Sequence, residues 1–264
     1  MKFVSIGGSL IHYSVEGPKY GRPLVFINSL GLDFRMWDDV ASNLRSDYRI
    51  VRYDKRGHGL SDSPPAPYSL DQFVSDLHSL FGHLELPSAA LVGISIGGMI
   101  AMEFAATHPD LVPSMVLFDT GARIGSAEAW EARIQEVRSK GLEAMTPVIL
   151  SIWFSRSFAD ERPEVHRGFR NSLIRTPLEG YLGACAALRD ADLTQRLSAI
   201  EATTLVAAGD QDSSTTLDQG RALAEAIPGA RFELLEGAGH LATVEQPEKA
   251  AHMIRTFLEA QDYV

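Results

Sequence analysis

Short apolar runs and longer amphipathic runs alternate along the first half of the chain. The apolar runs are typical of strands, and they fall at residues 10–15, 23–28, 48–53, 89–92 and 112–119. Between the last three lie two helical patterns, residues 70–84 and residues 98–106. Strand, helix, strand in this order predicts right-handed crossovers and a mostly parallel sheet that is covered on both faces.

This alternation stops after Thr120. Residues 126–188 show helical patterns but no convincing strand, and prolines interrupt these patterns at Pro147, Pro163 and Pro177. Strand patterns return at residues 203–208 and 231–235, and the last helix has an apolar face made of Ala250, Met253, Ile254, Phe257 and Leu258. We therefore predict an α/β core formed by residues 1–121 and 193–264. Residues 122–192 would form a helical cap over the carboxyl ends of the strands, where ligands bind in such sheets.

Composition narrows the class of protein. The chain has 264 residues, of which 45% are hydrophobic, as expected of a globular α/β protein with a substantial core. Its formal net charge of −10 argues against nucleic acid or an anionic membrane as a partner. The single cysteine, Cys185, cannot form an internal disulfide, and residues 1–7 lack the apolar core of a signal peptide. We expect a cytoplasmic protein without nucleic-acid or membrane partners, whose oligomeric state the sequence leaves open.

The motif with the most chemical content is Gly93-Ile94-Ser95-Ile96-Gly97, a G-x-S-x-G sequence between a predicted strand and a predicted helix. Such a turn exposes the serine hydroxyl on a strained backbone, and its glycines avoid collisions with the neighbouring strand and helix. The start of the helix also brings unpaired N–H groups to the place where negative charge would develop. Ser95 is the predicted nucleophile.

A serine nucleophile needs a base to take its proton and an acid to orient that base. His240 follows the last predicted strand on a glycine-rich loop, and two carboxylates, Asp210 and Asp212, follow the strand before it. The oxyanion formed on attack needs two donors. The backbone N–H of Ile96 is the first expected donor, and that of Leu30, on the loop after an earlier strand, is the second.

The serine–acid–histidine order is that of the α/β-hydrolases, and the chain resembles this superfamily from Asn28 to His240. Among its members the chain resembles the 3-oxoadipate enol-lactonases of bacterial aromatic-acid degradation. The matching segments are N-S-L-G at residues 28–31, M-W at 36–37, Y-D-K-R-G-H-G-L-S at 53–61, G-I-S-I-G-G at 93–98 and G-A-G-H at 237–240.

This resemblance implies the α/β-hydrolase fold, with a mostly parallel central sheet flanked by helices and a helical cap inserted after the sixth strand. It favours Asp212 over Asp210 as the acid, because the acid of such proteins usually lies in a G-x-x-D loop. It implies that His58, in a Gly-His-Gly turn, is a structural residue rather than a second base. It further implies cofactor-free hydrolysis of 3-oxoadipate enol-lactone, a small anionic lactone, to 3-oxoadipate.

The predicted cap is the place to look for substrate-binding side chains. Residues 120–190 contain ten Arg and Lys against nine Asp and Glu, a net charge of +1, which leaves −11 for the rest of the chain. Trp130 and Arg133 are three residues apart and would share a helical face, suited to a planar ring that bears a carboxylate. A half-buried tryptophan beside a solvated arginine explains the pair equally well. Trp153 is a further candidate for the pocket wall.

Other chemistries have little support. The chain has no H-E-x-x-H motif and no glycine-rich nucleotide-binding motif, so neither a metal site nor a nucleotide site is expected. Two alternatives use the same triad: another carboxylic ester hydrolase and a cofactor-free perhydrolase. A third is a non-catalytic ligand receptor on a hydrolase fold, because such receptors can retain the triad.

Overall fold

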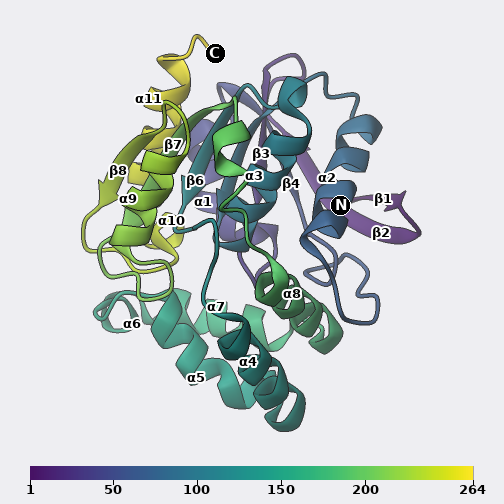
Figure 1. Ribbon diagram of the computed structural model, residues 1–264, viewed down its shortest axis with the longest axis vertical. Helices are drawn as coiled ribbons and strands as arrows, with labels where there is room; N and C mark the ends of the chain where they lie inside the picture. Colours follow the sequence, from purple (N-terminus) through teal and green to yellow (C-terminus); the bar gives the residue numbers. More distant parts are fainter. Residues whose placement is uncertain (264) are drawn as a thin grey trace.

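The computed structural model describes residues 1–263. Within this part of the chain an eight-stranded sheet has the order β1-β2-β4-β3-β5-β6-β7-β8 (Figure 1). The strands are β1 (Lys2–Ile6), β2 (Ser9–Glu16), β3 (Arg22–Ile27), β4 (Tyr48–Tyr53), β5 (Ala90–Ile94), β6 (Ser114–Phe118), β7 (Thr203–Gly209) and β8 (Arg231–Leu235). All pairs from β4 to β8 along the sheet are parallel, and only β2 pairs antiparallel, with β1 and β4. The prediction of a mostly parallel sheet is confirmed.

The sequence patterns missed β1. This strand lies at the edge of the sheet and pairs only with β2. Its side chains are mostly exposed, Phe3 among them at 42%. A strand of this kind leaves no apolar run in the sequence. The other strands lie within about two residues of their predicted bounds, as expected of buried strands with helices on both faces.

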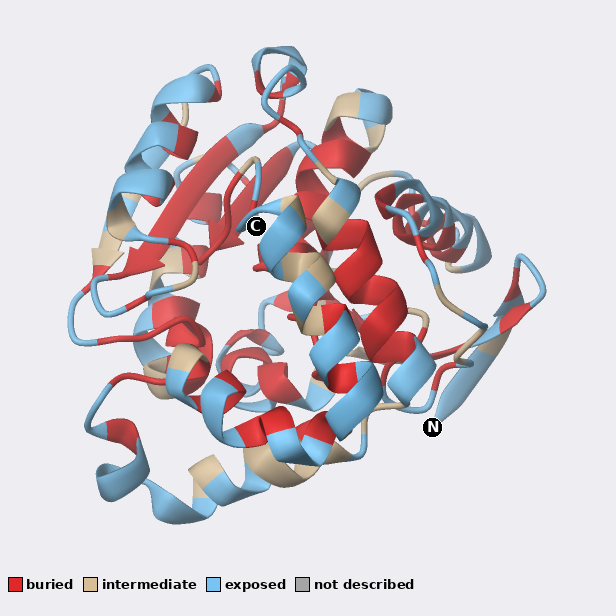
Figure 2. Ribbon diagram, turned by 60° about the horizontal axis from the view of Figure 1, so that its bottom comes forward, coloured by how far each residue is buried: buried red, intermediate tan, exposed pale blue. Residues whose placement is uncertain are grey.

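Helices cover the sheet, and Figure 2 shows its inner strands buried while most helices expose an outer face. Helix α1 packs against α11, and α2 packs against α3. The helices and helical turns of the core are η1 (Phe34–Trp37), α1 (Asp38–Leu44), α2 (Leu70–His83), α3 (Ile96–Thr107), η2 (Pro109–Leu111), η3 (Leu197–Ala199), α9 (Leu217–Ala226), α10 (Ala242–Glu245) and α11 (Pro247–Glu259). Helix α11 buries Ala250, Ile254, Phe257 and Leu258 and half-buries Met253, so it uses the predicted face.

Helices alone lie between β6 and β7 in the described chain, and Figure 1 shows them gathered at one end of the sheet. They are α4 (Ala127–Lys140), α5 (Leu142–Trp153), α6 (Phe158–Glu161), α7 (Pro163–Ile174) and α8 (Leu178–Asp190). We call residues 122–192 the cap, and its division from the core at these bounds stays a prediction.

Two details of the cap differ from the sequence patterns. Pro163 and Pro177 lie at helix starts, but Pro147 lies inside α5, which continues through it. Val148, an apolar residue inside α5, is 53% exposed. The buried stripe of α5 includes Thr146, Leu150 and Trp153, which places Val148 on the outer side.

No helix within residues 1–263 is long and apolar enough to cross a membrane. Cys185 lies buried in α8, where burial raises the pKa of its thiol to about 12. The side chain therefore behaves as a small apolar group.

Candidate active site

Ser95 lies on a sharp turn between β5 and α3. Its backbone has φ 57° and ψ −125°, a conformation that residues other than glycine rarely adopt. The Ser95 N–H lies 3.1 Å from the carbonyl oxygens of both Phe118 and Asp119, and the Thr120 hydroxyl donates to the Ser95 carbonyl at 2.7 Å. The end of β6 therefore holds the strained turn in place.

Close backbone approach explains the two glycines of the motif. A Cβ atom at Gly93 would lie 2.4 Å from the carbonyl oxygen of Gly97, and one at Gly97 would lie 2.2 Å from that of Ile27. Both distances are far inside van der Waals contact, so any side chain would push α3 away from β3 and β5. The G-x-S-x-G spacing follows from this packing.

His240 and Asp212 meet at the carboxyl ends of β8 and β7. The His240 Nδ1 lies 2.8 Å from Asp212 Oδ2, and both side chains are buried. Asp212 also accepts hydrogen bonds from the Thr215 hydroxyl at 2.5 Å and from the backbone N–H groups of Ser214 and Thr215. Burial by itself would raise the pKa of Asp212, but His240 and these donors outweigh it and lower the pKa below its usual value. Asp212 is therefore an ionised partner for the imidazole.

Asp210 has a different position. Its side chain is exposed, and its Oδ1 accepts a hydrogen bond from the Gly237 N–H at 2.7 Å. Asp210 thus ties the loop after β7 to the loop after β8, whereas the contact to His240 comes from Asp212. Asp212, the acid that the family resemblance favours, is thus the aspartate in contact with His240.

A third carboxylate near this pair, Asp119, was not singled out by the sequence patterns. Asp119 directly follows β6, is fully buried and has φ 43°. Its Oδ1 accepts a hydrogen bond from the Gly209 N–H at 2.8 Å, which ties the end of β6 to the end of β7. Burial, and then the charge of Asp212, raise the pKa of Asp119 well above its usual value. The fold therefore favours the protonated form of Asp119 beside Asp212.

The two predicted oxyanion donors lie at the same edge of the sheet. Leu30 is on the loop after β3, and Ile96 is the first residue of α3. Neither backbone N–H is hydrogen-bonded to another of the described residues. Leu30 lines the same cavity as Ser95 and His240, and the oxyanion role of the two N–H groups stays a prediction.

This cavity has a volume of about 220 Å³ and lies between core and cap. The core contributes Ser29, Leu30, Ser95, Ser214 and His240. The cap contributes mainly apolar and aromatic side chains together with one arginine: Ile124, Trp130, Arg133, Ile149, Ile152, Trp153 and Tyr181. All three cap residues proposed from the sequence, Trp130, Arg133 and Trp153, are in this wall.

Arg133 is the cation in the cavity wall. Its guanidinium lies 5.7 Å from the Trp130 ring centroid, and its Nη1 donates to the Tyr181 hydroxyl at 3.3 Å. No carboxylate of residues 1–263 lies within ion-pair distance of it. The Trp130 indole N–H donates to the Ile124 carbonyl at 2.6 Å, which fixes the ring beside Arg133. The wall therefore offers a positive charge that the described protein leaves unneutralised.

Sequence reasoning also missed Thr215 and Tyr181. The first had a usable signal, because an aspartate followed within three residues by serine or threonine often forms a turn that closes on its own carboxylate. No local sequence signal points to Tyr181, because it lies 48 residues from Arg133 and contacts it only through the packing of α4 on α8.

The alpha/beta hydrolase fold model matches residues 22–247, and the chain therefore belongs to this family of hydrolases. It is 35% identical to 3-oxoadipate enol-lactonase 2 of Acinetobacter baylyi, over 94% of this chain and 93% of that one. It is 31% identical to a protein of Caulobacter segnis whose name gives carbamate hydrolysis as its proposed activity, over 94% and 96% of the two chains. The crystal structure of an enol-lactonase from Burkholderia xenovorans superposes with a TM-score of 0.95 at 34% identity, over 98% of this chain and 100% of that one.

Paired amide substitutions separate the two candidate acids. We expect Asp212→Asn to lower kcat on an activated ester such as p-nitrophenyl acetate by roughly 1,000-fold or more, because an amide neither stabilises the imidazolium nor fixes its tautomer. Asp210→Asn is the matched control, and it should stay within about threefold of the unsubstituted protein, since its amide oxygen can still accept from Gly237. Steady-state kinetics would contradict the assignment if both losses were mild or if their order were reversed.

Proposed function

We propose that this hydrolase opens a small enol-lactone that bears a carboxylate. The observation that carries the proposal is the combination found in one cavity: Ser95 on its strained turn, His240 held by Asp212, and Arg133 without a carboxylate partner among the described residues. The relatives support it, because two of the three reported above are named enol-lactonases.

The chemistry follows from the roles that these groups can play. Ser95 Oγ attacks the lactone carbonyl carbon while His240 takes its proton, and Asp212 stabilises the resulting imidazolium. The N–H groups of Leu30 and Ile96 donate to the oxygen that becomes negative. The ring C–O bond then breaks, and His240 returns the proton to the leaving enol oxygen.

The second half of the reaction uses the same groups. The leaving enol stays attached to the acyl chain, so the acyl-enzyme holds the whole opened substrate. His240 removes a proton from water, which attacks the ester carbonyl carbon of acylated Ser95. The tetrahedral intermediate collapses with return of the proton to Ser95 Oγ, and the enol tautomerises to a ketone. No cofactor enters any of these steps.

The substrate class follows from the cap. A guanidinium can pair with a carboxylate through two parallel hydrogen bonds, and the Trp130 ring beside it suits a flat lactone ring. Residues 120–190, which make up most of the cap, are also less acidic than the rest of the chain, with a net charge of +1 against −11. Together with the relatives, this favours 3-oxoadipate enol-lactone as substrate and 3-oxoadipate as product.

A second candidate is hydrolysis of another ester or of a carbamate, favoured by the similarity to the Caulobacter segnis protein. A perhydrolase would also use the same triad. These reactions share the core groups and differ in what the cap must hold, so substrate profiling separates them.

Ultraviolet monitoring of enol-lactone consumption tests the proposal. We expect kcat/KM for 3-oxoadipate enol-lactone to exceed that for neutral esters and a simple carbamate by about 100-fold or more, because Arg133 pairs only with an anion. Ser95→Ala should fold normally and lose activity by roughly 10⁵-fold or more. Faster turnover of the carbamate than of the lactone would favour the second candidate function instead. Substantial activity in Ser95→Ala would contradict the mechanism.

Arg133 provides a separate test of the carboxylate site. Arg133→Ala should lower kcat/KM for the anionic lactone by roughly 10- to 150-fold, mainly through KM, and leave a small neutral ester nearly unchanged. Arg133→Lys should recover only part of the loss, because an ammonium cannot form the two-pronged pair.

Arg138→Ala is the matched control for Arg133, since this exposed arginine lies on the same helix. It should not change either substrate's kinetics. Equal losses on the neutral ester would mean that Arg133 holds the cap together instead. An unchanged lactone KM in Arg133→Ala would place the carboxylate elsewhere.

A further inference from the structure

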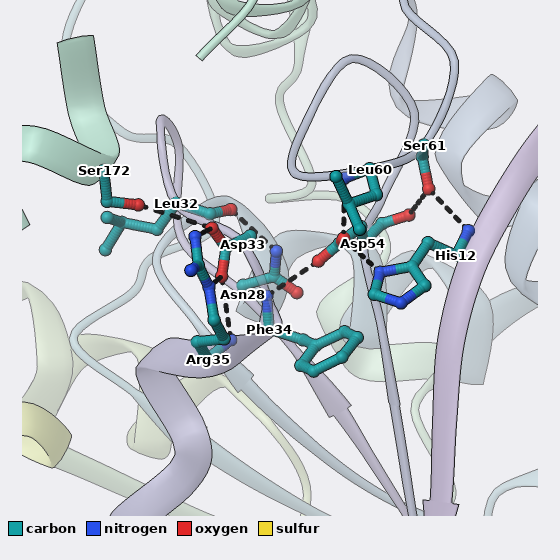
Figure 3. Close-up of polar contacts among 10 residues, drawn as sticks. All are labelled: His12, Asn28, Leu32, Asp33, Phe34, Arg35, Asp54, Leu60, Ser61 and Ser172. Carbon is teal, nitrogen blue, oxygen red and sulfur yellow. Dashed lines mark hydrogen bonds and ion pairs between the residues drawn. The ribbon is translucent and has the colours of Figure 1, made fainter. Parts of the chain in front are cut away.

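The loop that carries Leu30 rests on the loop that follows β4. Strands β3 and β4 are parallel neighbours, so their carboxyl ends, and the two loops that begin there, lie side by side. Figure 3 shows Asp54 at the centre of this contact: its Oδ1 accepts from the Phe34 N–H at 2.8 Å, and its Oδ2 accepts from Leu60 and His12. On the other side of the loop, the Asn28 amide donates to the Leu32 carbonyl at 2.7 Å. The Leu30 loop is thus fixed at both ends.

Lys55 is the unusual member of this contact. It is 1% exposed, and its Nζ donates to the Ser29 carbonyl oxygen at 2.6 Å. No carboxylate of residues 1–263 is within ion-pair distance of it, and the Ser29 carbonyl is its hydrogen-bond partner in this part of the chain. Burial lowers the pKa of Lys55 to about 7, so the fold disfavours the charged amine here. A lysine in this position costs stability.

The partner of Lys55 links it to the oxyanion site. Ser29 C=O and Leu30 N–H belong to one peptide group, which is trans because the described chain has its cis bond elsewhere, at Ala66-Pro67. In a planar trans peptide the carbonyl and the N–H point in opposite directions. When Lys55 holds the Ser29 oxygen, the Leu30 N–H is therefore directed away from Lys55, and Ser29 and Leu30 both line the cavity that contains Ser95.

The next peptide along the loop is held in a similar way. The Gly31 N–H donates to His58 Nε2 at 3.0 Å, while His58 Nδ1 lies 3.1 Å from the Arg56 carbonyl oxygen. Burial, and then the charge of Lys55, lower the pKa of His58 well below its usual value, which keeps Nε2 unprotonated as an acceptor. Two side chains of the β4 loop therefore set two successive peptides of the Leu30 loop.

We propose that Lys55 is a positioning residue for the oxyanion hole: its amino group fixes the Ser29–Leu30 peptide and polarises it, so that the Leu30 N–H is aimed and strengthened as a donor. Hydrogen bonds in a chain polarise one another, and a donor to the carbonyl makes the N–H of the same peptide a better donor. This inference rests on the proposed function, in which the Leu30 N–H stabilises the oxyanion. It explains why a lysine is present at a position whose burial disfavours the charged amine.

Lys55→Met tests the proposal, because methionine has a similar length and removes only the amine. We expect kcat on p-nitrophenyl acetate and on the enol-lactone to fall about 100-fold, the loss typical of a misplaced group, with KM within about twofold. Affinity for a boronic acid, which forms a tetrahedral anionic adduct on serine, should fall by a similar factor, while affinity for the product diacid is unchanged. The melting temperature at pH 7 should be equal or higher.

Two further variants sharpen the result. Lys55→Gln keeps a neutral donor and should lose less kcat than Lys55→Met. Lys249→Met, an exposed lysine on α11, is the matched control and should change neither kinetics nor boronate affinity. Active-site titration measures the concentration of functional sites in each preparation, so that kcat is expressed per folded site.

Three outcomes would overturn the inference. They are an unchanged kcat in Lys55→Met, equal losses of boronate and product affinity, and a lowered melting temperature or failure to fold, which would make Lys55 a structural residue. Any of these alongside an inactive Ser95→Ala would leave the proposed function standing. Activity retained by Ser95→Ala would instead contradict the proposed function itself.

Discussion

Parallel strands end at one edge of a sheet, and this constraint brings the candidate site together. Each strand from β3 to β8 delivers one of its groups from the loop that follows it: Leu30, Lys55, Ser95, Asp119, Asp212 and His240. The distances between them depend on the register of the sheet rather than on local sequence. Close packing of β3, β5 and α3, which admits only glycine at Gly93 and Gly97, sets how near Ser95 can lie to the Leu30 loop.

Several features at this edge are unfavourable for stability alone. Ser95 and Asp119 have positive φ, Lys55 is buried without an ion pair to any of residues 1–263, and Asp119 is buried beside another carboxylate. Strain and buried ionisable groups of this kind persist where surrounding structure holds them, and they concentrate at functional sites. The hydrogen bonds from Thr120 to Ser95, from Thr215 to Asp212 and from Lys55 to Ser29 are the restraints that hold these groups in place.

The sequence predicted those parts of the molecule that have local signals. Buried strands, the amphipathic α11 and the turn around Ser95 each depend on residues within a few positions of one another. The exposed edge strand β1 and the course of α5 through Pro147 had no such signal, because edge pairing and tertiary packing decide them. The same holds for Tyr181 and Lys55, whose partners lie 48 and 26 residues away along the chain. Arg133 could be proposed from spacing, but the lack of a carboxylate partner for it within residues 1–263 could not.

Covalent labelling tests the central claim, that Ser95 is an activated nucleophile in a cavity that receives a carboxylate. The protein is treated with an activated phosphonate ester, followed by intact-mass measurement and peptide mapping. We predict a single adduct on Ser95, formed more slowly in the presence of 3-oxoadipate but not in the presence of its dimethyl ester. An adduct on another residue, no adduct, or equal protection by the neutral diester would contradict this account.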